Sequence, residues 1–579
     1  MGVMGAGRRA RQLAVVRATS DRSAGSEALA RAMLDAGLAA ELAAGREPLL
    51  AALPAVAGCR VLEIGAGDGS LTRALVDAGA LVDALEADDD LRAIAAARLL
   101  DVPGATLGSD LAGWRSDGRL ADGVDLVIVH APAAGQGAFE EVAGAALSAT
   151  ELAGPAGVVR EGGAIALVLR APLGLRHVAR VVPGRLAPAG DRPMGLDAVA
   201  HVLATAGFPA QRRLALHGPG DAVDAIIDDA AWDDPAIAGR LPLVLGMLGR
   251  PDAAATDDAA GSRTADRPGS PGADGLPRST WPALDDAFER VLAAGLGRAL
   301  ADRWLLVAAR DEVPVAPVPG GAWIPGRPDR ATEWRTGWRL ERSGAGGGDG
   351  DGDTVLLTPE HAGPETWSGP LSWRPAALAV PAGQRGDRLL ARALLEDGID
   401  APGTLALLGA WAQAAGAADA GPERTPVEIG PERCVVDAAG TWHLLPGPIL
   451  ARFPVPFEVR THRAVARLLV ERVLPSGIPA GLDPSATVAE SAAALLRRAG
   501  TPVAEGSDAM ALDLEIELRR RTAPGTADGL AIRRIVRREH GARIGTLVAG
   551  TSVAWLAAAA TRWLVAERGT RTEDGGTEP

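Results

Sequence analysis

The sequence predicts an α/β fold class, with a parallel sheet in its first half, then a second α+β region and a C-terminal helix. A short apolar run from Val61 to Ile64 is typical of a buried parallel strand, and three alternating glycines follow it. Ser70 to Ala78 then has apolar residues at helical spacing, and Leu81 to Leu85 is a second apolar run. A strand, a glycine turn, a helix and a strand in this order indicate a doubly wound sheet.

The turn after the first strand holds Gly65, Gly67 and Gly69. A ligand can approach the backbone closely only where no Cβ intervenes, and such turns often need a positive φ, which glycine adopts readily. The spacing is G-x-G-x-G, which differs from the G-x-G-x-x-G of dinucleotide sites and from the phosphate-loop pattern. Glu63 stands near the end of the first strand. Glu86 follows the second strand, where an acid can hydrogen-bond a ribose diol.

Further elements are expected on both sides of this unit. The predicted helices lie at 26–53, where two are expected, and at 91–100 and 197–208; the predicted strands are 105–107, 124–129 and 164–169. The fourth strand ends at His130. Side chains at the carboxyl end of such a strand face the ligand, so His130 is a candidate general base for an acceptor hydroxyl. A strand-end histidine that bonds only to the backbone fits the pattern equally well.

The unit from Arg60 to about Leu99 resembles the nucleoside-binding half of class I S-adenosylmethionine-dependent methyltransferases, which have a Rossmann-like fold. The resemblance implies that the turn glycines lie against the methionine part of S-adenosylmethionine and that Glu86 takes the ribose hydroxyls. Asp110, after the third strand, would face the adenine. The implied cofactor-binding set is Glu63, Gly65, Gly67, Gly69, Glu86 and Asp110.

The segment from Leu169 to His177 resembles a narrower group of bacterial methyltransferases, associated with surface-polysaccharide and glycan biosynthesis. This resemblance implies a glycan or small-molecule acceptor and makes His177 a second candidate catalytic residue. Ala171, Arg176 and His177 stand where that group has asparagine, lysine and tyrosine. The acidic-His-Thr-Gly segment expected downstream is also missing.

Composition narrows the functional classes. The formal net charge of −14 argues against a nucleic-acid partner, because binding to phosphates relies on basic surface. The chain has no lysine, tyrosine or asparagine, which is typical of a GC-rich genome and rules out a Schiff-base lysine. Cys59 and Cys434 give no metal spacing, and Thr354 stands where a calcium loop needs glycine, so no metal is expected. No export signal is present, so a cytoplasmic location is expected.

The second half resembles the kinase-like domain that is fused to the same group of methyltransferases. The segment from Val427 to Asp437 matches the catalytic loop, with Glu428 and Arg433 in place of the catalytic aspartate and the asparagine, and Pro446 stands where a metal-binding aspartate belongs. This domain is therefore expected not to transfer phosphate. The run 544–566 begins with uncharged residues and predicts a packing helix or a peripheral membrane or protein contact.

These observations predict the following domains: a flexible N-terminus at 1–19, a cofactor-binding methyltransferase domain at 20–250, a disordered linker at 251–278, a degenerate kinase-like domain at 279–520, and a helical segment with a disordered tail at 521–579. The predicted function is methyl transfer from S-adenosylmethionine to an oxygen of a glycan or small metabolite. The alternative is a non-catalytic scaffold of a glycan-assembly complex that keeps the fold. The glycine spacing disfavours a dinucleotide oxidoreductase.

Overall fold

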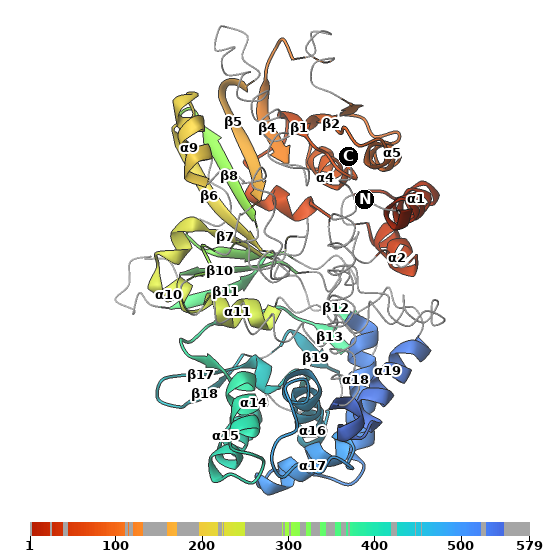
Figure 1. Cartoon of the computed structure of the whole chain (residues 1–579), viewed down its shortest axis with the longest axis vertical. Helices are drawn as coiled ribbons and strands as arrows, with labels where there is room; N and C mark the ends of the chain where they lie inside the picture. Colours follow the sequence, from red (N-terminus) through yellow and green to blue (C-terminus); the bar gives the residue numbers. More distant parts are fainter. Residues whose placement is uncertain are drawn as a thin grey trace, which may run out of the picture. The chain divides into compact units, whose positions relative to one another are not determined.

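The structure is a computed structural model of the chain, which divides into two units (Figure 1). Unit 1 consists of the described residues of Met1–Gly249 and Val291–Glu360, and unit 2 of those of His361–Pro579. The residues that the structure describes are 3–23, 26–36, 38, 45–109, 114, 120–130, 159–170, 196–217, 223, 225–248, 292, 294, 296–299, 301, 303–312, 320–325, 336–342, 354–360, 366–368, 371–417, 425–445, 447–452, 454–522 and 529–548.

Parallel strands form the first part of the sheet in unit 1, in the order β3-β2-β1-β4-β5. They are β1 (Arg60–Ile64), β2 (Leu81–Leu85), β3 (Ala105–Gly108), β4 (Val124–His130) and β5 (Val159–Arg170). From β1 the chain builds outward to β2 and β3, and later adds β4 and β5 on the other side of β1. The junction of β1 and β4 is therefore the topological switch point, beside which open α/β sheets bind ligands.

The helices of this part of unit 1 are α1 (Val3–Ala18), α2 (Glu27–Asp35), the 3₁₀ helix η1 (Glu47–Ala52), α4 (Ser70–Asp77), α5 (Asp89–Arg98) and α9 (Leu196–Thr205). Of these, α4 and α5 pack on the parallel strands, η1 packs on α4, α1 packs on α5 and α2, and α9 packs on a later strand of the sheet. The helix α4 packs beside β2 and β3. Leu71 and Leu75 on its apolar face are fully buried. Asp88 caps the start of α5, because its carboxylate accepts hydrogen bonds from the backbone N–H groups of Asp90 and Leu91. The predicted helix–strand alternation is thus confirmed over α4, β2 and α5.

Antiparallel strands continue the sheet beyond β5, in the order β5-β8-β6-β7-β9-β10-β11. They are β6 (Ala210–His217), β7 (Ala225–Asp228), β8 (Arg303–Ala309), β9 (Ala322–Ile324), β10 (Trp338–Arg342) and β11 (Val355–Pro359). The elements η2 (Asp229–Trp232), α10 (Pro235–Ala238) and α11 (Leu241–Leu248) follow β7 in the chain. Because β8 pairs antiparallel with both β5 and β6, those two strands point the same way.

The place of β8 corrects the predicted domain boundary. The sequence assigns 251–278 to a linker and 279–520 to a second domain, but the described residues of 291–360 belong to unit 1. All seven residues of β8 are buried, and each pairs with residues of β5 and β6. The prediction failed because strand pairing is non-local: the pattern of 303–309 marks a strand but does not identify its neighbours.

The N-terminus also differs from its prediction. Residues 1–19 are predicted to be flexible, but Val3–Ala18 is the helix α1, which packs on α5. Val16 is fully buried in a cluster with residues of α2 and α5. Near the middle of α1, the Arg9 guanidinium bonds the Asp88 carboxylate at 2.8 Å. This helix is therefore tied to the same element that flanks the glycine turn.

Unit 2 combines short antiparallel strands with a larger helical part. One sheet has the order β12-β13-β19-β16 and another the order β15-β17-β18. The strands are β12 (Thr366–Ser368), β13 (Leu371–Trp373), β14 (Leu378–Ala379), β15 (Gln384–Arg385), β16 (Thr425–Pro426), β17 (Cys434–Val436), β18 (Trp442–Leu444) and β19 (Ile449–Ala451). The helices are α14 (Gly386–Glu396), α15 (Pro402–Ala417), η5 (Pro431–Arg433), α16 (Phe457–Leu468), the π-helical turn η6 (Leu469–Val473), α17 (Val488–Arg498), α18 (Ser507–Thr522) and α19 (Gly529–Gly541).

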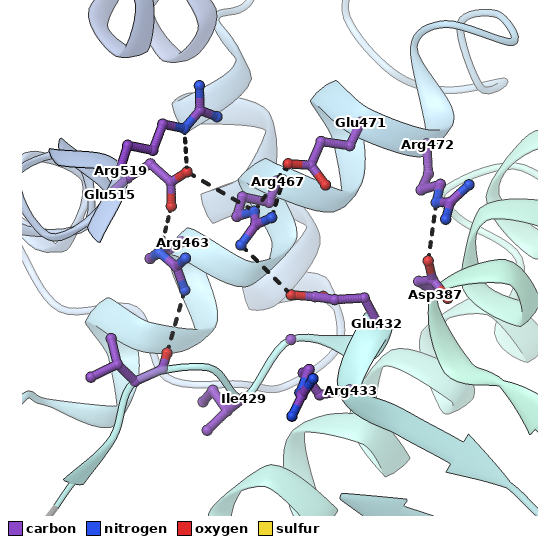
Figure 2. A network of polar contacts seen from close by, with 12 residues as sticks. Asp387, Ile429, Glu432, Arg433, Arg463, Arg467, Glu471, Arg472, Glu515 and Arg519 are labelled. Atoms are coloured by element: carbon purple, nitrogen blue, oxygen red, sulfur yellow. Dashed lines mark hydrogen bonds and ion pairs between the residues drawn. The ribbon is translucent and has the colours of Figure 1, made fainter. Parts of the chain in front are cut away.

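A buried network of arginines and carboxylates lies inside unit 2 (Figure 2). Glu515 of α18 accepts hydrogen bonds from Arg463 Nε at 2.6 Å and from Arg519 Nε at 2.7 Å. Arg463 also donates from Nη1 to the backbone oxygen of Val427 at 3.3 Å, which ties the segment before η5 to α16. The Glu515 and Arg463 side chains are each no more than 3% exposed. Through this bond, the network holds the start of the 427–433 segment against α16.

Several predictions fall outside the described residues. Asp110, His177, Pro446 and the predicted linker 251–278 are among them. The run 544–566 is described only as far as residue 548, and there Ile544 is fully buried in the core of unit 2, with Leu547 packed against that core. Within the described ranges, no helix has the length and apolar content needed to cross a membrane.

Candidate functional site

The backbone after β1 has the conformation that its glycines predict. Gly65, Gly67 and Gly69 have φ values of +80°, +63° and +77°. A left-handed backbone conformation costs conformational free energy for L-residues that have a side chain, so glycine suits all three positions. The loop begins at the carboxyl end of β1 and ends at the start of α4, with Gly69 as the residue before the helix. The turn therefore lies at the switch point of the parallel sheet.

The three glycines have different neighbours. A Cβ on Gly65 would lie 3.0 Å from the backbone oxygen of His130, and one on Gly69 would lie 3.0 Å from Ala95 of α5. Because these neighbours are backbone or a packed helix and cannot move easily, the fold itself requires glycine at positions 65 and 69. A Cβ on Gly67 would instead meet the end of the Arg46 side chain, at 3.2 Å from Nη1. Gly67 is thus the glycine that faces a movable group.

Glu86 reaches from the end of β2 to the turn. Its Oε2 accepts a hydrogen bond from the backbone N–H of Gly67 at 2.6 Å, and its Oε1 accepts one from the N–H of Asp88 at 2.9 Å. An ionised carboxylate has about four acceptor positions, so each oxygen can accept one more bond, for example from a hydroxyl. The structure thus brings together Glu86 and Gly67, two residues of the predicted cofactor-binding set.

Glu63 lies behind the turn. Its side chain is fully buried, its Oε2 accepts a 2.6 Å hydrogen bond from the Thr72 hydroxyl of α4, and its Oε1 is 3.3 Å from His130 Nε2. Burial raises the pKa of the Glu63 carboxyl to about 7, although the hydrogen bond from Thr72 and the charge of Arg46 oppose that rise. The Glu63 carboxyl therefore contacts Thr72 and His130 inside the protein. The sequence pattern predicted only its place near the end of the first strand and not these two partners.

This environment predicts a pH effect on stability. The pKa of Glu63 is about 7 in the folded chain against an ordinary value of 4.5, so its contribution to stability is full below pH 4.5 and is lost as pH rises to 7. Glu63→Gln mimics the protonated carboxyl. At pH 8 we expect it to be more stable than the wild type by roughly 1 to 3 kcal/mol, with little difference at pH 4.5.

Urea denaturation at the two pH values measures this difference. Glu161→Gln is the control, because Glu161 is an exposed carboxylate on β5. A Glu63→Gln variant that is less stable than the wild type at pH 8 would show that the ionised carboxylate is needed in the fold.

His130 ends β4 next to the turn, as the sequence predicts. Its side chain is 4% exposed, and its Nε2 faces Glu63. This contact orients the imidazole ring, since a carboxyl beside one ring nitrogen fixes the tautomer. The other predicted site residues, Asp110 and His177, both lie outside the described residues.

Sequence reasoning missed two residues of the site. Asp68, between the glycines, accepts hydrogen bonds from Arg98 at 2.8 Å and from Gln12 at 3.1 Å, and so joins the turn to α5 and α1. Arg46 donates from Nη1 to the backbone oxygen of Gly65 at 2.5 Å. The position of Asp68 within the glycine motif was a visible signal. Arg46 had no local signal, because its contact with the turn depends on how η1 packs against α4.

Comparisons with known proteins give partial likenesses. No protein-family model matches the sequence, and no curated protein matches it. Among solved structures, a SAM-dependent methyltransferase from Aquifex aeolicus is 15% identical, with 30% of this chain and 84% of that chain covered and a TM-score of 0.21. One from Archaeoglobus fulgidus is 11% identical, with 45% and 91% covered and a TM-score of 0.25. Aeropyrum pernix fibrillarin, solved with natively bound S-adenosyl-L-methionine, is 18% identical, with 31% and 74% covered and a TM-score of 0.23.

Proposed function

We propose that unit 1 binds S-adenosylmethionine at the glycine turn and transfers its methyl group to an oxygen of a glycan or small metabolite. The observation that carries the proposal is the meeting of Glu86 and Gly67 at the β1–β4 switch point, at 2.6 Å. A carboxylate at the end of the second strand and a glycine without a Cβ would together accept a nucleoside at close range.

The residues of the turn fit this ligand in two respects. The carboxylate of Glu86 keeps acceptor capacity for a ribose diol beside its two backbone bonds. Gly67 faces a side chain end that can move, whereas Gly65 and Gly69 face packed structure. The bound cofactor would supply an electrophilic methyl group. Alignment of that methyl with the acceptor provides much of the rate in such a displacement, so the site must hold its ligands in place.

His130 is the proposed general base. It ends β4 beside the turn, and Glu63 would orient its ring from behind at 3.3 Å. In this arrangement Glu63 is a positioning residue, and the proton of an acceptor hydroxyl would move to the imidazole.

One observation favours the alternative, a non-catalytic scaffold. The turn satisfies its own polar groups: Glu86 bonds the N–H of Gly67, and Arg46 bonds the oxygen of Gly65. A turn whose backbone N–H and C=O groups already bond to side chains of the protein needs no ligand for its stability. Methyl transfer to a panel of glycans separates the two readings, because a scaffold would transfer no methyl group whether or not it binds S-adenosylmethionine.

We infer that unit 2 keeps a kinase-like arrangement without phosphate transfer. Arg433, which stands where a metal-binding asparagine would be, is buried and donates from Nε to the backbone oxygen of Leu445 at 3.3 Å. A guanidinium in that position supplies positive charge and no metal ligand. Unit 2 would then act as a packing or docking module.

Calorimetry on the full chain tests the proposed function. The wild type is expected to bind S-adenosylhomocysteine, the demethylated product, and Gly67→Ala to bind it at least about tenfold more weakly, because the added methyl enters the space above the turn. Gly58→Ala is the matched control: Gly58 also has a positive φ, +76°, but a Cβ there has nothing within 4 Å. Both substitutions carry similar backbone strain.

A folded wild type that binds neither S-adenosylmethionine nor its product would contradict the proposal. Equal weakening in Gly67→Ala and Gly58→Ala would show that the effect is strain and that Gly67 does not face the ligand.

A further inference from the structure

The helix α19 of unit 2 has a buried apolar side and exposed basic residues. Ile532 and Val536 are buried, and α19 packs on α18 through them. Arg533, Arg537 and Arg538 are exposed. Arg533 and Arg537 are one turn apart and so lie on the same side of the helix, and Arg538 follows next around its axis. We call the exposed side chains of these three arginines the basic face of α19.

The basic face of α19 has no carboxylate partner among the described residues. Glu539 is the only acid of α19, and its Oε2 lies 2.9 Å from Nη1 of Arg519 on α18. None of the three arginines of the basic face forms an ion pair or a side-chain hydrogen bond within the part of the chain that the structure describes. Their charges are exposed to water and are accessible to an external anion.

Helix electrostatics alone do not account for the basic face. The helix dipole favours a cation in the last turn, which applies to Arg538. Arg533 lies nearer the middle of α19, and it forms a like-charge pair with Arg537 at i and i+4, which destabilises a helix. In a chain whose formal net charge is −14, this face is a local exception. An anion bound there would relieve the repulsion between the arginines.

The sequence after α19 indicates which kind of anion fits. Ile544 is fully buried in the core of unit 2, so the chain is fixed to this unit shortly after α19 ends. From 549 to 561 the sequence has no charged residue, and it includes Trp555. The surface of a lipid bilayer binds arginine side chains through its anionic headgroups, and it also takes up Trp and apolar side chains. A nucleic acid binds through its phosphates, to which an uncharged run adds little. The bilayer is favoured because it uses both features.

We propose that the basic face of α19 binds the anionic surface of a phospholipid bilayer and so holds unit 2 there. This inference goes beyond the proposed function, because it concerns where the chain works and not the methyl transfer itself. One arginine near an anionic bilayer strengthens binding about fivefold, so the three together strengthen it roughly 100-fold. Stable binding to a bilayer takes two signals, and the uncharged run after residue 548 is the second.

Sedimentation of the full chain with lipid vesicles tests the proposal. One set of vesicles contains phosphatidylcholine alone, and the other contains equal parts of phosphatidylcholine and phosphatidylglycerol. We expect the wild type to bind the anionic vesicles roughly 100-fold more tightly than the neutral ones, and this preference to shrink as salt is added. The variant Arg533→Gln/Arg537→Gln/Arg538→Gln is expected to bind the anionic vesicles roughly 100-fold more weakly than the wild type does.

The matched control replaces three other exposed arginines and therefore has the same net charge as the triple variant. It is Arg11→Gln/Arg374→Gln/Arg392→Gln, and its binding to the anionic vesicles should stay within about threefold of the wild type. Thermal unfolding of each variant shows whether the fold is kept. If the triple variant of α19 does not fold, Arg533→Gln replaces it, with an expected loss of about fivefold.

Each of the other outcomes overturns the proposal. A wild type that binds neither set of vesicles, or binds both equally, has no surface for anionic lipid. Unchanged binding in the folded variant of α19 shows that the basic face is not that surface, and an equal loss in the control shows a general effect of net charge. Tighter binding of the wild type to a single-stranded oligonucleotide than to the anionic vesicles, lost in the variant of α19, would make the basic face a nucleic-acid contact.

Discussion

Cutting the chain after residue 250 is expected to unfold unit 1, even though the glycine turn and every strand from β1 to β7 would remain. The cut removes β8, whose seven residues pair with β5 on one side and with β6 on the other. Leu305, Leu306 and Val307 are no more than 1% exposed. Each such side chain contributes about 1.5 to 3 kcal/mol by burial, so these three alone approach the whole stability of a typical domain.

The loss would also leave two open strand edges inside the sheet. The backbone N–H and C=O groups of β5 and β6 that bond β8 would face water, and such edges pair readily with other chains. We therefore expect the segment 1–250 to aggregate or to show no cooperative melting by circular dichroism. The segment 1–360, which keeps β8 to β11, should melt cooperatively. Cooperative melting of 1–250 at the same temperature as 1–360 would contradict this account.

Replacing Glu515 by glutamine is expected to destabilise unit 2 by about 3 to 5 kcal/mol. Burial by itself would raise the pKa of Glu515, but Arg463, Arg467 and Arg519 outweigh that effect and hold it well below its ordinary value. The carboxylate is therefore ionised at neutral pH, and its contribution is lost only in acid. Glu515→Gln keeps the shape but leaves two buried guanidinium groups without their shared anion (Figure 2).

Asp513→Asn is the control for this experiment. Asp513 lies on the same helix, two positions before Glu515, and is exposed, so the change should stay within about 0.5 kcal/mol of the wild type. Calorimetric melting of the full chain measures both variants. If Glu515→Gln melts like Asp513→Asn, the arginines of the network do not depend on Glu515.

The unit made of β1, the glycine turn, α4 and β2 was predictable because its sequence signals are local. An apolar run, alternating glycines and a helical spacing all lie within 61–85, and the structure has β1, the turn, α4 and β2 at those places. Placing Glu86 beside the turn was predictable too. It follows β2, and parallel strands in register end at the same edge of the sheet.

The sequence by itself thus determined the strand–turn–helix unit and the residue types at its edge. The tertiary structure decided the rest, because the remaining contacts join residues that are far apart in the chain. It added β8 between β5 and β6, turned Glu63 inward to Thr72 and His130, and brought Arg46 over Gly67. Such contacts depend on which surfaces pack together after collapse, and no periodicity within a short window records them.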